Sequence, residues 1–430
     1  RTRVVVAASL AGGVLSGVTS ADGHVLGHGS GVLPASLLAG EWPDVQAPAM
    51  AGARGGAWGI ALAAAVFDPL TRQRLAGWVD GMLPGGGVDV VIEGDPLVAG
   101  LPWETLTLPG TGVGLVLRAG VTLCRVVTGS PLPQPVAVAG PVKVLAAVAA
   151  PDETKTPNRP LDVEAEMQAV LDATADPAGN GLVHILEVAD LTSITAAVAD
   201  TGYAVLHLSA HGSTTSLELE DEDGEPVPVT AAGLVDVLRR AGRPVPLIVL
   251  SSCSGGAGGA AGLAAGLISG GADRVLAMNG PVPDDYATRL AAALYRDLVA
   301  HPDRPVGQAL AVARQQMVTQ DSTQAHRGER VGPWWALAGL WTAAGDGPLI
   351  DSSLPETPLP AVPDPPAGLA ELPVGYLIGR RAQVRDGLRI LRHHPSSIDE
   401  FGAVGGVVYT GIGGIGKTAV ARRVVTRLNE

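Results

Sequence analysis

Residues 246–256 read PLIVLSSCSGG, an apolar run that leads directly into a cysteine followed by glycines. A second run of the same kind, residues 203–212, reads YAVLHLSAHG and leads into a His-Gly pair. Such short, almost continuously apolar runs are typical of parallel strands that are buried on both faces. Parallel strands present their carboxyl ends at one edge of the sheet, where ligands bind in open α/β folds. We therefore expect His211 and Cys253 to lie on the same rim of a parallel sheet.

The same pattern continues on both sides of these two runs, from residue 141 to about residue 320. Three more buried strands are predicted, at residues 143–149, 182–188 and 274–278. Apolar side chains at helical spacing predict intervening helices around residues 163–171, 191–198, 230–242 and 284–298. Alternating strands and helices are typical of an α/β fold in which helices cover a mostly parallel sheet.

Residues 216–230 interrupt this alternation. They predict a β-hairpin that turns around Asp223 and Gly224, hangs on the edge of the sheet and is exposed. The acidic run from Asp221 to Glu225 is interpreted as a solvated turn rather than as a partner contact.

Composition narrows the class of protein. The formal net charge of -13 and the pI of about 5.1 repel nucleic-acid phosphates, so nucleic acid is not an expected partner. Cys124 and Cys253 cannot form a disulfide framework, and no apolar run is long and uninterrupted enough to suggest a membrane span. We expect a cytoplasmic protein. The chain starts at Arg1 without a methionine, so we also expect that an upstream segment is missing.

The residue types at the predicted rim suit acyl transfer. A cysteine thiolate attacks a peptide carbonyl, and a neighbouring histidine lowers the pKa of the thiol and then protonates the leaving amine. Gly212 and the Gly255-Gly256 pair allow a substrate backbone to approach closely. The backbone N–H groups of Gly212 and Cys253 are the candidate oxyanion donors.

Either residue alone has a more ordinary interpretation, because a cysteine after a strand is usually a small buried hydrophobe. The common placement of His211 and Cys253 at neighbouring strand ends favours catalysis. His207, inside its strand, is interpreted as a packed residue, and Cys124 as a core residue.

Several further segments resemble one known family, the CHAT domains of the caspase and separase clan. The resemblance rests on residues 205–212 and 248–256, and it extends to residues 101–104 (LPWE), 283–285 (PDD), 294–298 (LYRDL) and 333–337 (PWWAL). It covers nearly all of residues 1–345 and implies a caspase-like cysteine endopeptidase with an inactive N-terminal lobe. Residues 278–281 (MNGP) depart from the turn that the family often has there, at the expected substrate pocket.

Asp284 and Asp285 follow a predicted strand and could line an acidic pocket for a basic residue before the scissile bond. The alternative is that they cap the next helix at its N-terminus.

Residues 411–418 read GIGGIGKT and fit the phosphate-binding loop G-x-x-x-x-G-K-[ST]. A strand at residues 404–409 and a helix at 419–428 are predicted on either side of this loop. Backbone N–H groups in the loop would bind the phosphates of ATP or ADP, Lys417 the β and γ phosphates, and Thr418 a Mg²⁺ ion. The candidate nucleotide-binding residues are Gly411, Gly413, Gly414, Gly416, Lys417 and Thr418.

Residues 376–381 (YLIGRR) resemble the entry motif of STAND-type NTPases such as NB-ARC and NACHT proteins. We therefore expect the start of such a domain, which is not a complete ATPase because too few residues follow Thr418 for the remaining motifs. The predicted organisation is an N-terminal lobe at 1–130, a catalytic domain at 131–350, a proline-rich linker at 351–373 and the start of the NTPase domain at 374–430.

The favoured hypothesis is a CHAT endopeptidase under a C-terminal nucleotide-binding switch that oligomerises on activation. Its substrate would be a protein or peptide, and the family suggests a role in prokaryotic defence or programmed cell death. Two alternatives are a non-catalytic adaptor and an NTPase with a regulatory CHAT module.

Overall fold

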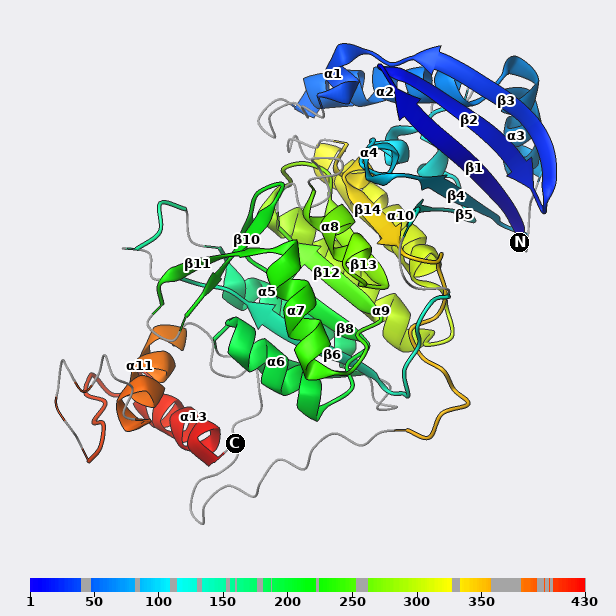
Figure 1. Ribbon diagram of the computed structural model, residues 1–430. Helices are drawn as coiled ribbons and strands as arrows, with labels where there is room; N and C mark the ends of the chain where they lie inside the picture. Colours follow the sequence, from blue (N-terminus) through cyan, green and yellow to red (C-terminus); the bar gives the residue numbers. More distant parts are fainter. Residues whose placement is uncertain are drawn as a thin grey trace.

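The structure is a computed structural model. It describes residues 1–39, 48–81, 86–108, 114–129, 134–151, 155–158, 161–175, 181–186, 188–221, 224–252, 262–326, 333–356, 380–392, 398, 402 and 405–429. Within these ranges one eleven-stranded sheet crosses the molecule in the order β3-β2-β1-β4-β5-β14-β13-β12-β8-β6-β7 (Figure 1).

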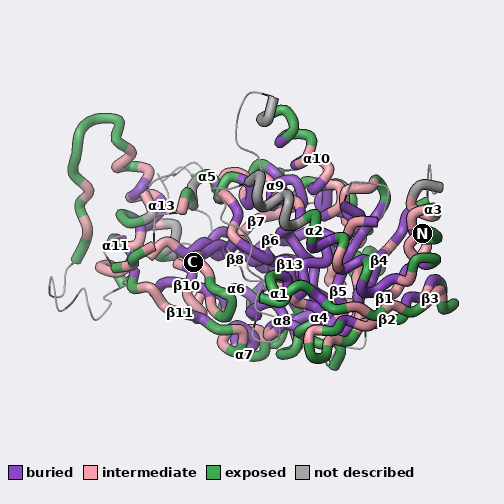
Figure 2. Tube along the Cα trace, turned by 90° about the horizontal axis from the view of Figure 1, so that it is seen from above, coloured by how far each residue is buried: buried purple, intermediate pink, exposed green. Residues whose placement is uncertain are grey.

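The half of the sheet that holds the predicted rim consists of parallel strands that are buried, apart from a partly buried strand at the edge. These strands are β6 (Val142–Val148), β7 (Gly181–Leu186), β8 (Val205–Ser209), β12 (Leu247–Ser251) and β13 (Arg274–Met278). The predicted strands are confirmed to within a few residues, and Figure 2 shows the centre of the sheet as buried. One antiparallel strand, β14 (Ala338–Thr342), pairs with β13 and was not predicted.

Helices cover both faces of these strands, as the sequence predicts. One face carries α5 (Val163–Thr174), α9 (Asp284–Ala300) and α10 (Val306–His326). The other carries α6 (Leu191–Asp200), α7 (Ala231–Ala241) and α8 (Leu263–Ser269). The pleat explains the two layers, because successive residues of a strand enter opposite hydrophobic clusters, for example Val205 and Leu206 of β8.

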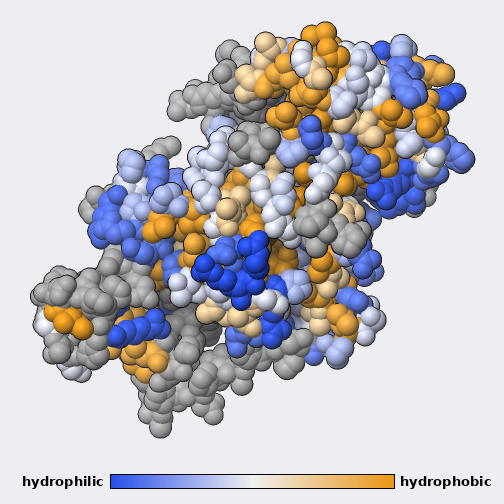
Figure 3. Space-filling view, in the orientation of Figure 1, coloured by the Kyte–Doolittle hydropathy of each residue, from blue (hydrophilic) through white to orange (hydrophobic). Residues whose placement is uncertain are grey.

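Helix α7 shows how local sequence sets the ends of an element. Thr230 accepts a hydrogen bond from the backbone N–H of Gly233 at the start of the helix, and Gly242 ends it with a φ of 69°. Asp236 pairs with Arg239 and Arg240 on its outer face, where Figure 3 shows a hydrophilic patch.

The N-terminal strands continue the same sheet around a hydrophobic cluster of their own. They are β1 (Thr2–Ala11), β2 (Val14–Ala21), β3 (His24–Val32), β4 (Val88–Gly94) and β5 (Val121–Val127), with helices α1 (Ala35–Leu38), α2 (Pro48–Val66), α3 (Pro69–Gly81) and α4 (Pro96–Ala99). Strands β1 to β3 form a three-stranded antiparallel meander. Strand β5 joins the two halves by pairing with β14.

A second, three-stranded sheet contains the predicted hairpin. Its strands are β9 (His211–Gly212), β10 (Ser216–Glu220) and β11 (Pro226–Thr230). The expectation that the hairpin is exposed was wrong for its inner face. Leu217 and Leu219 are buried because they pack into the cluster beneath α6 and α7.

The predicted linker lies outside the described residues from 357 onward, and described helices follow it. Helix α11 (Arg381–Leu391) packs against α13 (Lys417–Asn429) through a small apolar cluster. The helix predicted at 419–428 is confirmed. The strand predicted at 404–409 was wrong, because residues 405–410 form no strand and no described segment supplies them with a ladder partner. No helix in the described ranges is both long enough and apolar enough to cross a membrane.

Candidate active site

The rim predicted from the sequence is formed by the ends of β8 and β12. These two strands are parallel neighbours, and their last residues, Ser209 and Ser251, are partners in the ladder. His211 follows two residues after Ser209, in the short strand β9, which pairs with β10. The histidine is half-buried.

The two segments that continue from the ends of β8 and β12 are closely packed against each other. A Cβ atom added at Gly212 would lie 2.9 Å from both Cβ and Oγ of Ser252, which is closer than two such atoms can approach. Ser252 is itself buried. The segment that follows His211 therefore lies directly against the residue that precedes Cys253, at a point where only glycine fits.

Cys253 and the glycines Gly255 and Gly256 lie outside the described residues, so the predicted contact between His211 and Cys253 stays a prediction. Cys124, the other cysteine, is buried, and burial raises the pKa of its thiol far above the ordinary value. Its interpretation as a core residue is confirmed, because Cys124 is part of a buried hydrophobic cluster.

A buried carboxylate, which the sequence did not reveal, lies beneath the rim. Glu166 of α5 accepts hydrogen bonds from the hydroxyls of Ser209 and Ser251, the latter over 2.5 Å. Its Oε1 also lies 3.2 Å from Nε2 of His207, whose Nδ1 is 2.7 Å from the hydroxyl of Tyr295. The only signal in the sequence was the presence of polar residues within otherwise apolar strands.

Opposing effects set the charge state of Glu166. Burial by itself would raise the pKa of this carboxyl, but the hydrogen bond and charge of His207, with the two serine hydroxyls, bring the pKa below its ordinary value. Glu166 is therefore ionised at neutral pH, and an ionised carboxylate only accepts hydrogen bonds. It follows that Nε2 of His207 carries a proton.

Asp284 and Asp285 lie in the first turn of α9, just past the carboxyl end of β13, and both are exposed. Neither caps the helix through a side-chain hydrogen bond, since Pro283 occupies the cap position. Asp285 pairs with Arg289 one turn on, at 3.3 Å. Their part in a substrate pocket stays a prediction.

The LPWE segment supplies a second buried charge cluster. Glu104 accepts a hydrogen bond of 2.5 Å from Nη1 of Arg125 and one of 3.3 Å from Asn279, and all three residues are buried. The Arg125 guanidinium lies over the ring of Trp341, 4.3 Å from its centroid. This cluster connects the N-terminal half to the loop after β13, where the sequence departs from the family pattern.

Three glycines of the loop at residues 411–418 have backbone conformations that other residues rarely adopt. Gly411, Gly414 and Gly416 have φ values of 151°, 78° and 93°, which favour glycine, and α13 begins directly after them. The Lys417 ammonium donates to the carbonyls of Gly411 and Ile412, at 3.0 and 2.8 Å. This geometry fits a nucleotide phosphate, with Lys417 at the loop and a helix N-terminus beneath it.

Helix α11 contacts the hairpin beside the rim. Arg385 donates to the buried carboxylate of Glu220, the last residue of β10, over 3.0 Å. Strand β10 in turn pairs with β9, and in this ladder Glu218 of β10 is the partner of His211 of β9. A continuous path of contacts thus leads from α11 to the predicted catalytic histidine.

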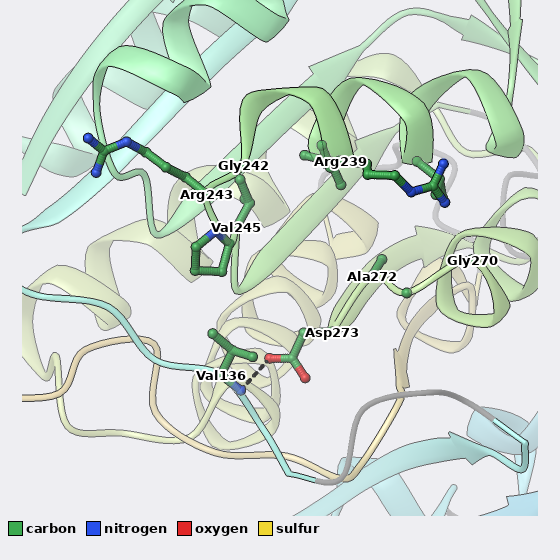
Figure 4. A pocket seen from close by; sticks show the side chains of 12 residues that line it. Val136, Arg239, Gly242, Arg243, Val245, Gly270, Ala272 and Asp273 are labelled. Carbon is green, nitrogen blue, oxygen red and sulfur yellow. Dashed lines mark hydrogen bonds between the residues drawn. The ribbon is translucent and has the colours of Figure 1, made fainter.

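A cavity of about 340 Å³ opens at the opposite edge of the sheet, and its lining includes Arg239, Arg243 and Asp273 (Figure 4). Asp273 precedes β13, and its carboxylate accepts a hydrogen bond from the backbone of Val136. The amino ends of the strands form this edge, so the cavity is separate from the candidate active site.

Known proteins give the following comparisons. The CHAT domain model matches residues 57–388, a range that ends within α11. No curated protein sequence matches the chain. Among solved structures, the Arg-specific cysteine proteinase gingipain R is 14% identical, with a TM-score of 0.43 over 66% of this chain and 69% of that one.

A structure of the pro- and mature domains of RgpB from Porphyromonas gingivalis is also 14% identical, with a TM-score of 0.43, over 66% of this chain and 71% of that one. Separase from Saccharomyces cerevisiae, in complex with securin, is 12% identical with a TM-score of 0.33, over 60% of this chain. The match spans only 16% of the separase chain.

Proposed function

Because the chain belongs to the CHAT domain family and has a caspase-like α/β fold, we propose that it is a cysteine endopeptidase with Cys253 as nucleophile and His211 as its acid-base partner. One observation carries the proposal. Gly212, next to His211, packs against Ser252, next to Cys253, so the two segments are neighbours at the carboxyl edge of the sheet.

The proposed chemistry has two steps. The Cys253 thiolate attacks the peptide carbonyl, the C–N bond breaks, and the imidazolium of His211 gives its proton to the leaving amine. Water then attacks the acyl-enzyme with His211 as base, which releases the acid and restores the thiol. The N–H groups of Gly212 and Cys253 would stabilise the oxyanion in both steps.

We also propose that a nucleotide controls this activity. Residues 411–418 would hold ATP or ADP, with Lys417 at the phosphates and Thr418 at Mg²⁺. When bound, the positive charge of Mg²⁺ would offset the negative charge of the phosphates. The contact of Arg385 with Glu220 supports control over the site, because it connects α11, which packs on α13, to the hairpin that pairs with His211.

The wider role in this proposal follows the family resemblance. The substrate is a protein or peptide, and activation by the STAND-type module produces an oligomer in the cytoplasm, in prokaryotic defence or programmed cell death. The exposed carboxylate of Asp284 is the part of the site that would favour a basic residue before the scissile bond.

The test compares the wild-type protein with the Cys253→Ala and His211→Ala variants, each incubated with ATP, Mg²⁺ and a proteome. We expect new protein N-termini with the wild type only. Identical cleavage patterns would reject the peptidase and favour the adaptor alternative. A Lys417→Ala variant that still gains thermal stability from ATP and Mg²⁺ would reject the nucleotide site separately.

A further inference from the structure

Glu166 binds the ends of the two strands that carry the proposed catalytic pair. Ser251 donates to its Oε1 and Ser209 to its Oε2, so the two oxygens of one carboxylate hold two adjacent strands. Each serine is the last residue of its strand, and each stands two positions before a proposed catalytic residue. Any displacement of one serine from the other would break one of these hydrogen bonds.

We infer that Glu166 is a positioning residue of the proposed peptidase, whose buried carboxylate fixes the spacing between the strand ends that carry His211 and Cys253. The inference rests on the proposed function. The role assigned to Glu166 is positioning rather than catalysis, because it acts through Ser209 and Ser251.

The carboxylate is itself held from several sides. His207 approaches it from β8, and Tyr295 of α9 holds the other ring nitrogen of that histidine. Glu166, His207 and Tyr295 are all buried, so water does not compete for these hydrogen bonds. Strands β8 and β12 therefore both contact the carboxylate that α5 carries, and α9 supports it through His207.

Stability alone does not account for this arrangement. Burying a carboxylate carries a large desolvation cost, and apolar side chains of similar volume often stabilise a core as well or better. The network lies at the strand ends beneath the rim rather than in the middle of the sheet. A displacement of about 1 Å at a reacting group can lower a rate roughly 100-fold, so fixed spacing at this point has a direct catalytic value.

The chain allows a test without a known substrate. Cys253 and Cys124 are its only cysteines, and Cys124 is buried. Alkylation of the folded protein by iodoacetamide, measured from pH 5 to pH 10 with ATP and Mg²⁺ present, therefore reports on Cys253, with Cys253→Ala as the blank. The variants are Glu166→Gln and Ser251→Ala. The control is Asp297→Asn, which changes a buried carboxylate in α9 that does not contact Glu166, Ser209 or Ser251.

We expect Glu166→Gln and Ser251→Ala to raise the pH of half-maximal alkylation by about one unit, toward that of an ordinary thiol, and Asp297→Asn to leave it unchanged. For Glu166→Gln the direction is informative. Removing a nearby negative charge would by itself favour the thiolate and lower this pH, so a rise in this variant indicates lost contact with His211.

The outcomes separate the two proposals. If His211→Ala raises the pH of half-maximal alkylation but Glu166→Gln and Ser251→Ala do not, the positioning role is overturned and the peptidase proposal stands. If His211→Ala has no effect, the proposed catalytic pair fails and the positioning role fails with it. Should Glu166→Gln not fold, Ser251→Ala decides alone, because it removes a single hydroxyl.

Discussion

The guanidinium of Arg385 lies 3.0 Å from the carboxylate of Glu220, which joins helix α11 to the hairpin strand that pairs with His211. The Glu220 side chain is fully buried and that of Arg385 nearly so. Breaking a buried ion pair by removing one of its partners typically costs about 3–5 kcal/mol. The first prediction therefore concerns the effect of α11 on the candidate site.

We expect Arg385→Ala to release α11 from the hairpin and to change the rate of Cys253 alkylation at pH 7 at least threefold. Limited proteolysis should cleave near residue 380 faster in this variant. Gln383→Ala, which changes an exposed side chain on the same helix, is the control. An unchanged alkylation rate in a variant whose α11 is demonstrably released would contradict the coupling of α11 to the site.

The second prediction concerns the close packing at the rim. An alanine at Gly212 would place its Cβ 2.9 Å from Ser252, so Gly212→Ala should push the two proposed catalytic segments apart and lower the proposed peptidase activity about 100-fold. Gly202→Ala is the matched control, because nothing lies within 4 Å of a Cβ there. Peptide cleavage and thermal unfolding are measured together, and equal activity in both variants would show that the packing at Gly212 does not affect catalysis.

Sequence alone predicted the parallel strands β6, β7, β8, β12 and β13 well, and for a physical reason. Strands buried on both faces are apolar throughout, so the run at residues 274–278 coincides with β13. Strand β14 and the segment at residues 405–410 were harder to predict. Strand β14 depends on pairing with β5 and β13, which are distant in sequence, and the segment at 405–410 has no described ladder partner.

The arrangement around the candidate site was predicted in part. Topology alone placed His211 on the rim formed by the ends of β8 and β12. Glu166 escaped prediction because it occupies one position of a helix whose apolar spacing is ordinary, and its role depends on serines from two distant strands. The segment at 404–409 illustrates the converse, since an apolar run predicted a strand that the structure does not form.

The third prediction concerns pH and Asp346, a half-buried residue after β14. Burial raises the pKa of this carboxyl from 3.8 to about 6, although it accepts hydrogen bonds from the backbone of Gly307 and Gly347. The folded protein thus holds the proton more tightly than the unfolded chain does. Stability from this group is full below the unfolded pKa and is lost as the pH rises through about 6.

The free energy of unfolding of the wild type, relative to Asp346→Asn, should therefore fall on the order of 2 kcal/mol between pH 4 and pH 7. Urea unfolding at several pH values measures this difference. Asp351→Asn is the control, because a hydrogen bond from Ser353 lowers the pKa of Asp351 and its titration lies below this window. If the free energy of unfolding of the wild type, relative to Asp346→Asn, instead rises with pH, the predicted direction is contradicted.

The last prediction concerns Glu104, whose carboxylate neutralises buried arginine in the N-terminal half. Glu104→Gln would leave Arg125 buried without an anionic partner, and Arg314, 3.9 Å from the same carboxylate, would lose its attraction too. We expect a loss of about 3–5 kcal/mol in the free energy of unfolding. Arg240→Ala breaks an exposed ion pair with Asp236 and should cost at most about 1 kcal/mol. Equal losses in both variants, measured by urea unfolding, would show that burial does not set the strength of the Glu104 cluster.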